Sequence, residues 1–157
     1  KVKTKKIDKL IKNIDNEYFS SEANQENLSF VFEISKKLNL KKDVLIDTIR
    51  NFKGLKYRQQ IIFKNEYLTI INDSKSTSFS SSISLLKVNP NIFWLLGGVH
   101  KKGDKFDLSK KYFKNIKAFV YGKNKSFFNK KLKGKINYQN FDTLKDAIKK
   151  VFFIIQK

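Results

Sequence analysis

Three short segments combine turn-forming residues with polar side chains suited to phosphate, ribose or carboxylate groups. They run from Phe52 to Arg58, from Ile71 to Ser78 and from Leu95 to Gly103. The second and third segments each follow an apolar run that predicts a strand. Because open α/β sheets bind ligands at the carboxyl ends of their strands, we expect these segments to line a ligand site.

The residues before the first segment predict helices. Apolar side chains recur at helical spacing from Ile7 to Ile14, and the stripe repeats downstream in Leu28, Val31, Phe32, Ser35 and Leu38. A third helix is predicted from Asp43, as its N-cap, to a stop at Gly54. A domain boundary near residue 53 follows, which separates residues 1–52 from residues 53–157.

Beyond this boundary the pattern changes to short strands alternating with helices. Two β-rich runs predict a hairpin, and apolar strands and helices then alternate as far as a last helix that begins at Thr143 with Asp146 in a capping box. The predicted elements are strands at 60–63, 67–71, 92–96, 118–121 and 136–138, helices at 108–113 and 125–132, and a serine-rich segment at 78–86. This rhythm predicts an α/β fold with a mostly parallel sheet and helices on both faces.

Composition narrows the chemistry further. The chain has 157 residues and no cysteine, and His100 is its single histidine, so disulfides, thiolate metal sites and cysteine nucleophiles are excluded. Its longest apolar runs, 92–99 and 151–155, are far shorter than the roughly 20 residues of a membrane-spanning helix. We therefore expect a soluble, cytoplasmic protein with no membrane partner.

The net charge of +20 invites a nucleic-acid-binding interpretation. Only Arg50 and Arg58 among the 34 basic residues are arginine, whereas proteins that read phosphates and bases favour arginine for its bidentate fork. The lysines are scattered among many Asn, Ile and Phe residues, a bias that codon usage in a low-GC genome produces. We favour compositional bias and keep a basic nucleic-acid-binding module as an alternative.

Together and in this order, the three segments resemble the C-terminal domain of the Mur ligases. The run Asn72-Asp-Ser-Lys-Ser-Thr77 is similar to the D-glutamate-adding branch, whereas sister branches typically have Tyr-Ala-His or Tyr-Asn-Ala there. Upstream, Ala23 to Asn27 is similar to the His-Asn-x-x-Asn element of the central ATP-binding domain. The resemblance covers nearly the whole chain. It implies a helical tail of the central domain at 1–52 and a Rossmann-like C-terminal domain, incomplete at its end, at 53–157.

The resemblance also implies a reaction. The family member would use ATP and Mg²⁺ to phosphorylate the carboxylate of UDP-N-acetylmuramoyl-L-alanine, and the amine of D-glutamate would then attack the acyl phosphate. ATP, D-glutamate and UDP-N-acetylmuramoyl-L-alanine are the expected partners. The enzyme is expected to be a monomer that acts in peptidoglycan synthesis in the bacterial cytoplasm. The P-loop and metal ligands are expected before Lys1, and a Ser-Phe-Asp-x-Phe element after Lys157. We expect the fragment to be inactive alone, and a non-catalytic remnant of the family stays open.

Residue roles in ATP binding follow from the resemblance. Asn24 and Asn27 would contact adenine through their amides, although Asn24 alone would suit a helix N-cap. Arg58 would reach the ATP phosphates, where a salt bridge is the ordinary alternative. Asp73 would accept hydrogen bonds from ribose hydroxyls, where an Asx-turn is the alternative.

The implied roles at the acceptor side involve Lys75, Thr77 and Lys101. Lys75 would neutralise the transferred phosphoryl group, and Thr77 with Lys101 would hold a carboxylate of D-glutamate. A solvated side chain is the alternative for either lysine. Gly97 and Gly98 would allow the backbone to approach a ligand closely.

The chain departs from the family pattern at three positions within these motifs. Ala23 and Tyr57 each replace a histidine, and Ser78 replaces an asparagine. We expect these positions to tune contacts rather than to define the chemistry.

Overall fold

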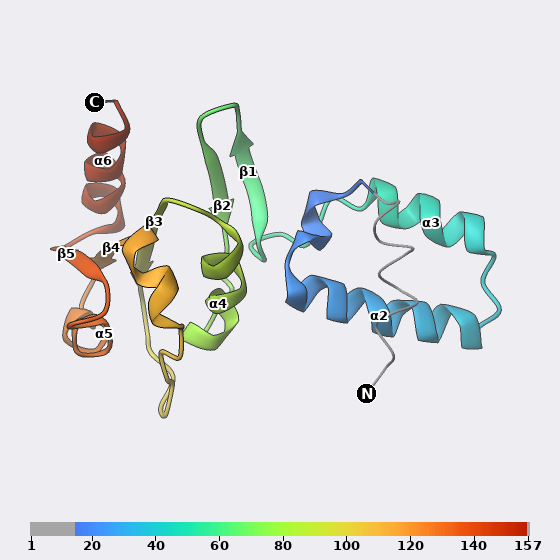
Figure 1. Cartoon of the computed structure of the whole chain (residues 1–157), viewed down its shortest axis with the longest axis horizontal. Helices are drawn as coiled ribbons and strands as arrows, with labels where there is room; N and C mark the ends of the chain where they lie inside the picture. The colour runs from blue at the N-terminus through green and yellow to red at the C-terminus, as the bar shows by residue number, and fades with distance from the viewer. Residues whose placement is uncertain (1–14, 157) are drawn as a thin grey trace. The chain divides into compact units, whose positions relative to one another are not determined.

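The computed structural model describes residues 15–156 (Figure 1), so the helical stripe predicted from Ile7 to Ile14 lies outside the described residues. The described chain divides into two compact units, and the division falls between Lys75 and Ser76. The domain boundary predicted near residue 53, where the pattern changes from helices to strands, stays a prediction.

The first unit consists of helices followed by a hairpin. Its elements are the 3₁₀ helix η1 (Glu17–Ser20), the α-helices α2 (Glu22–Lys37) and α3 (Lys42–Asn51), and the strands β1 (Gln60–Lys64) and β2 (Thr69–Asn72). Helix α2 starts after Ser21, whose hydroxyl accepts a hydrogen bond from the backbone N–H of Asn24 at 3.4 Å. The N-cap is thus Ser21, and the alternative role of Asn24 as a cap is wrong.

The predicted apolar stripe of α2 is only partly buried. Leu28 lies in the core of the helical part with Phe19 and Ile49, but Val31 and Leu38 are 44% and 65% exposed. Leu28 and Ser35 of the stripe are buried as predicted, and Asn24 joins them, because a polar side chain with internal hydrogen-bond partners can also face a core.

Helix α3 begins and ends earlier than predicted. Its N-cap is Lys41, and Asp43 lies in the first turn, where a carboxylate interacts favourably with the helix dipole. The helix ends at Asn51, and Gly54, with φ of +79°, belongs to the connection that follows. The predicted cap at Asp43 and stop at Gly54 are therefore wrong, although the helix itself is confirmed.

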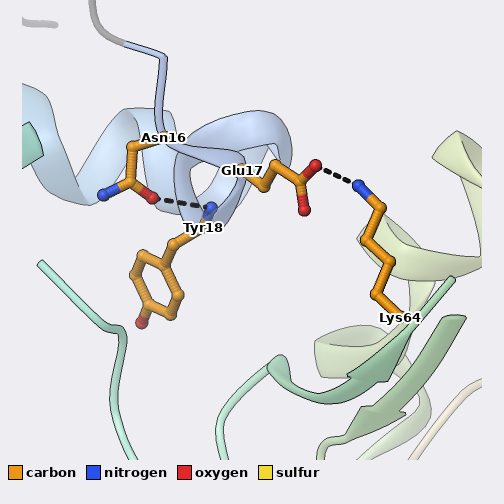
Figure 2. Close-up of polar contacts among 4 residues, drawn as sticks. All are labelled: Asn16, Glu17, Tyr18 and Lys64. Carbon is orange, nitrogen blue, oxygen red and sulfur yellow. Dashed lines mark hydrogen bonds and ion pairs between the residues drawn. The ribbon is translucent and has the colours of Figure 1, made fainter.

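Asn16 and Glu17 connect η1 to the rest of the first unit (Figure 2). The Asn16 side-chain oxygen accepts from the Tyr18 N–H at 3.0 Å, and its amide donates to the Ile49 carbonyl at 2.8 Å, near the end of α3. Glu17 forms an ion pair with Lys64 at the end of β1. One short helix therefore joins the end of α3 and the hairpin.

The predicted hairpin is confirmed as the antiparallel pair β1 and β2. Its register shifts between Ile61 and Phe63, and the Asn65 side-chain oxygen accepts from the backbone N–H groups of Tyr67 and Leu68. β2 therefore pairs with β1 alone and is not a strand of the parallel sheet that the other described strands form. The segment after β2 thus follows a strand, as predicted, but not a strand of that sheet.

The second unit alternates helices and strands, as predicted. Its elements are α4 (Phe79–Val88), β3 (Ile92–Gly97), the 3₁₀ helix η2 (Lys110–Asn115), β4 (Ile116–Tyr121), α5 (Lys125–Leu132), β5 (Asn137–Phe141) and α6 (Leu144–Ile155). The serine-rich segment forms most of α4. Thr143 caps α6 by accepting from the Asp146 N–H, which confirms the predicted cap.

The described strands of this unit form a parallel sheet in the order β3, β4, β5. Along β4, Ala118 and Val120 join the core shared with α4 and α5, whereas Phe119 packs with Ala147 of α6. Because successive side chains of a strand point to opposite faces, helices cover both faces of the sheet. This confirms the predicted fold class. No helix within residues 15–156 has the length and apolar character needed to cross a membrane.

Gly97 ends β3 opposite its partner Tyr121 on β4, and an added Cβ would meet the Tyr121 carbonyl oxygen at 2.5 Å. Since the paired backbone cannot move away, we predict that Gly97→Ala lowers the free energy of unfolding by about 1–3 kcal/mol, measured by urea denaturation of the chain. Val99→Ala, at a side chain that is 88% exposed, is the control and should stay within about 0.5 kcal/mol of the parent. Equal values for the two variants would contradict the close contact.

Candidate functional site

Arg58 lies in a tight turn whose backbone is unusual on both sides. The Arg58 N–H donates to the Leu55 carbonyl at 3.0 Å, and Tyr57 and Gln59 have φ angles of +66° and +47°. Left-handed conformations of non-glycine residues persist only where surrounding contacts impose them. The turn presents the Arg58 side chain to solvent, and Arg58 forms no ion pair with any residue of the range 15–156.

Two hydrogen bonds hold this turn against the segment after β2. The Gln59 N–H donates to Asp73 Oδ1 at 3.0 Å, and the Lys75 N–H donates to the Tyr57 carbonyl at 3.1 Å. Asp73 therefore bonds across the fold rather than closing an Asx-turn, which forms one residue earlier, where Asn72 accepts from the Ser74 N–H. The structure thus places the turn that contains Arg58 next to Asp73 and Lys75, and their common role at a ligand site stays a prediction.

Asn24 is joined to the same turn through Gln59. The Asn24 side-chain amide donates to the Tyr18 carbonyl at 2.6 Å and to Gln59 Oε1 at 3.1 Å, and the Ser21 hydroxyl donates to the same Gln59 oxygen at 2.8 Å. Asn24 is buried, whereas Asn27, one helical turn on, is exposed. The two predicted adenine contacts therefore differ: Asn24 is committed to internal bonds, and Asn27 faces solvent.

The Tyr18 ring packs against Gly54, just before this turn. Burial raises the pKa of the Tyr18 hydroxyl, while the charge of Arg58 and a backbone hydrogen bond at Leu55 oppose that rise. A Cβ added at Gly54 would meet the Tyr18 ring at 2.6 Å, so only glycine fits over it. Tyr18 and Gln59 were not among the sequence candidates, because neither belongs to a motif of charged or hydroxyl side chains.

The exposed face of the turn carries positive charge around an aromatic ring. The ammonium groups of Lys56 and Lys75 lie 5.1 and 6.0 Å from the centre of the Tyr57 ring. With Arg58 beside them, this face suits an anionic ligand. Within residues 15–156, no three acidic or histidine side chains gather in a way that could hold a metal ion.

The first unit also contains an open hollow of about 260 Å³. Tyr18 and Gln59 line it together with Asp15 and Arg50, but neither Arg58 nor Asp73 does. Its lining mixes both signs of charge. We therefore base the candidate site on the turn and not on this hollow.

In the second unit, Thr77 and Lys101 lie on two connected segments. Thr77 is exposed just before α4, whose start is closed by a capping box between Ser78 and Ser81. Lys101 is exposed on the loop after β3, and Asp104 of that loop accepts from the Phe79 N–H at 2.8 Å. The start of α4 and the Lys101 loop are thus fastened to each other.

Gly97 and Gly98 of the third segment have different roles. Gly97 is required by the close Tyr121 backbone, and Gly98, with φ of +97°, starts the loop that carries Lys101. The structure gives a packing reason for Gly97, whereas the expected close approach of a ligand at Gly97 and Gly98 stays a prediction.

Known proteins resemble the chain over most of its length. The UDP-N-acetylmuramoylalanine–D-glutamate ligase of Wolbachia sp. subsp. Brugia malayi is 32% identical over 130 residues, which is 83% of this chain and 26% of that protein. The ligase of the same name from Francisella tularensis subsp. tularensis strain SCHU S4 is 36% identical over 143 residues, which is 88% of this chain and 34% of that protein. This chain belongs to the Mur ligase family.

Solved structures agree on the fold of this Mur ligase chain. The match to MurF from Acinetobacter baumannii has a TM-score of 0.65 at 19% identity, and it covers 87% of this chain and 32% of the MurF chain. The UDP-N-acetylmuramate–alanine ligase MurC from Thermotoga maritima has a TM-score of 0.62 at 16% identity and covers 82% of this chain and 31% of its own. No protein-family model matches the chain. The chain spans about a third or less of the length of the curated relatives that it matches.

Asn24 and Asn27 offer a matched pair for testing the turn contacts. Asn24→Ala removes two side-chain hydrogen bonds of a buried amide and leaves partners unsatisfied, so we predict a loss of about 1–3 kcal/mol in the free energy of unfolding. Asn27→Ala, on the exposed face of the same helix, should change it by less than about 0.5 kcal/mol. Urea denaturation measures both, and equal losses would contradict the internal role of Asn24.

Proposed function

We propose that this chain supplies nucleotide and D-glutamate contacts to an ATP-dependent ligase that adds D-glutamate to UDP-N-acetylmuramoyl-L-alanine. The observation that carries the proposal is the 32–36% identity, over more than four fifths of the chain, to ligases of that name. The two bonds from the neighbours of Arg58 to Asp73 and Lys75 support it, because they hold the segments that carry three proposed ATP contacts next to each other.

The proposed reaction forms an acyl phosphate and then an amide, and ADP and phosphate leave. Phosphoryl transfer depends chiefly on positioning and on neutralising charge, which suits the residue types of this site. Arg58 would contact the ATP phosphates, Lys75 would stabilise the transferred phosphoryl group, and Asp73 would accept from ribose hydroxyls. Mg²⁺ would neutralise the phosphates when bound, and its ligands would come from outside residues 15–156.

Adenine recognition in this proposal falls mainly to Asn27. Its amide is exposed on α2, whereas the Asn24 amide already donates to two oxygens and would act by holding Gln59 in place. Thr77 and Lys101 would bind a carboxylate of D-glutamate from the start of α4 and the adjoining loop. Residues 1–52 would be the tail of the central ATP-binding domain, and residues 53–157 most of the C-terminal domain, of a cytoplasmic, monomeric bacterial enzyme of peptidoglycan synthesis.

The test is ligation by the complete enzyme that contains this chain. Asp73→Ala, Lys75→Ala and Lys101→Ala should each reduce kcat/KM by about a hundredfold or more, because they remove the proposed contacts to the ribose, to the transferred phosphoryl group and to D-glutamate respectively. ADP release that depends on both D-glutamate and UDP-N-acetylmuramoyl-L-alanine is the measurement.

Lys102→Ala is the matched control, since Lys102 is an exposed lysine next to Lys101 with no assigned contact. It should retain parental activity. Parental kcat/KM in all three site variants would reject the site, and ADP release that ignores D-glutamate would reject the reaction.

A further inference from the structure

The loop that carries Lys101 is held more firmly than its exposure suggests. Residues 99–103 are all exposed, and Val99 is 88% exposed. An exposed loop of this kind is ordinarily mobile, and an exposed lysine samples many rotamers. Three contacts nevertheless fasten this loop, two of them at the start of α5 and one at the start of α4.

The first contact comes from Asn124. This residue occupies the N-cap position of α5, yet its side chain makes no cap hydrogen bond to its own helix. The side-chain amide donates instead to the Gly98 carbonyl at 2.9 Å. An asparagine at this position ordinarily satisfies the first turn of its helix, so its use elsewhere fixes the start of the loop at the cost of a cap.

The second contact is made by His100. Its ring stacks on the Phe127 ring, with 3.9 Å between centroids and 15° between planes. Phe127 is half-buried and packs against the core of the second unit, where it also stacks on Phe79. His100, next to Lys101 in the chain, therefore rests on a base that the core holds in place.

The third contact is made by Asp104, which forms one hydrogen bond through its backbone and another through its side chain. Its N–H donates to the Lys101 carbonyl at 3.1 Å and so closes the turn that contains Lys101. Its Oδ2 accepts from the Phe79 N–H at 2.8 Å, at the first residue of α4 and two residues after Thr77. One carboxylate thus connects the Lys101 turn with the end of the Thr77 segment.

From these contacts we infer that His100, Asp104 and Asn124 are positioning residues that hold Lys101 in place to bind, with Thr77, a carboxylate of the incoming amino acid. The inference rests on the proposed function, which assigns that carboxylate to Thr77 and Lys101. Fixing the loop before binding lowers the entropy lost when the carboxylate is bound, so the three residues act on affinity for D-glutamate. They do not touch the reacting atoms.

The first arm of the test examines the loop itself in the 157-residue chain. Trypsin cleaves after Lys101 and Lys102 only when the loop opens. His100→Ala and Asp104→Ala should increase this cleavage rate about threefold to tenfold, and the increase should persist at low urea, where each variant is fully folded. His100→Phe keeps a ring on Phe127 and should restore the parental rate, and Val99→Ala is the control. Parental cleavage rates in both alanine variants would overturn the inference.

The second arm measures D-glutamate kinetics in the complete ligase. His100→Ala should raise the KM for D-glutamate about threefold to tenfold with little change in kcat, and His100→Phe should restore it. A raised KM in Lys101→Ala with a parental KM in His100→Ala would overturn the positioning role alone. A parental KM in both variants would overturn the proposed carboxylate site, and the positioning role with it.

Discussion

Two hydrogen bonds of opposite direction close the Arg58 turn onto the segment that follows β2. Gln59 donates to the Asp73 carboxylate, and Lys75 donates to the Tyr57 carbonyl. Because Tyr57 and Gln59 both adopt left-handed backbone conformations, the turn requires such external partners to persist. The exposed positions of Arg58 and Lys75 therefore depend on this closure. The binding of any ligand that needs both cations depends on it as well.

Buried polar groups extend this closure into the helices. Gln59 accepts from Ser21 and Asn24 at the start of α2, and Asn16 joins η1 to the end of α3. A network of this kind favours one arrangement over many, because each missing partner would leave a buried group unsatisfied.

The many lysines also contribute to packing. Several lysines lie over aromatic rings of their own unit, such as Lys117 over Phe93, so their stems cover apolar surface.

The sequence was sufficient to predict the order of elements in the second unit, since β3 and β4 are largely apolar runs between turn signals, whereas β5 is mostly polar and its predicted range, 136–138, overlaps it only in part. The fold class follows from that order. Predictions failed where polar residues take core positions, as with Asn24, and where a cap depends on one hydroxyl, as with Ser21. The motifs indicated Asp73 and Lys75, but not Gln59 or Asp104. Gln59 contacts Asp73, 14 positions away in the chain, and Asp104 contacts Phe79, 25 positions away. No local sequence pattern encodes such contacts.

If Asp73 closes the Arg58 turn onto the Lys75 segment, the two closing hydrogen bonds should open and close together. Amide hydrogen exchange of the Gln59 and Lys75 N–H groups tests it most directly, because each group is a donor in one of the two closing bonds. In the parent chain both amides should be protected. In Asp73→Ala both should lose protection together, although only Gln59 bonds to the missing carboxylate. Retained protection of the Lys75 amide in that variant would contradict the account.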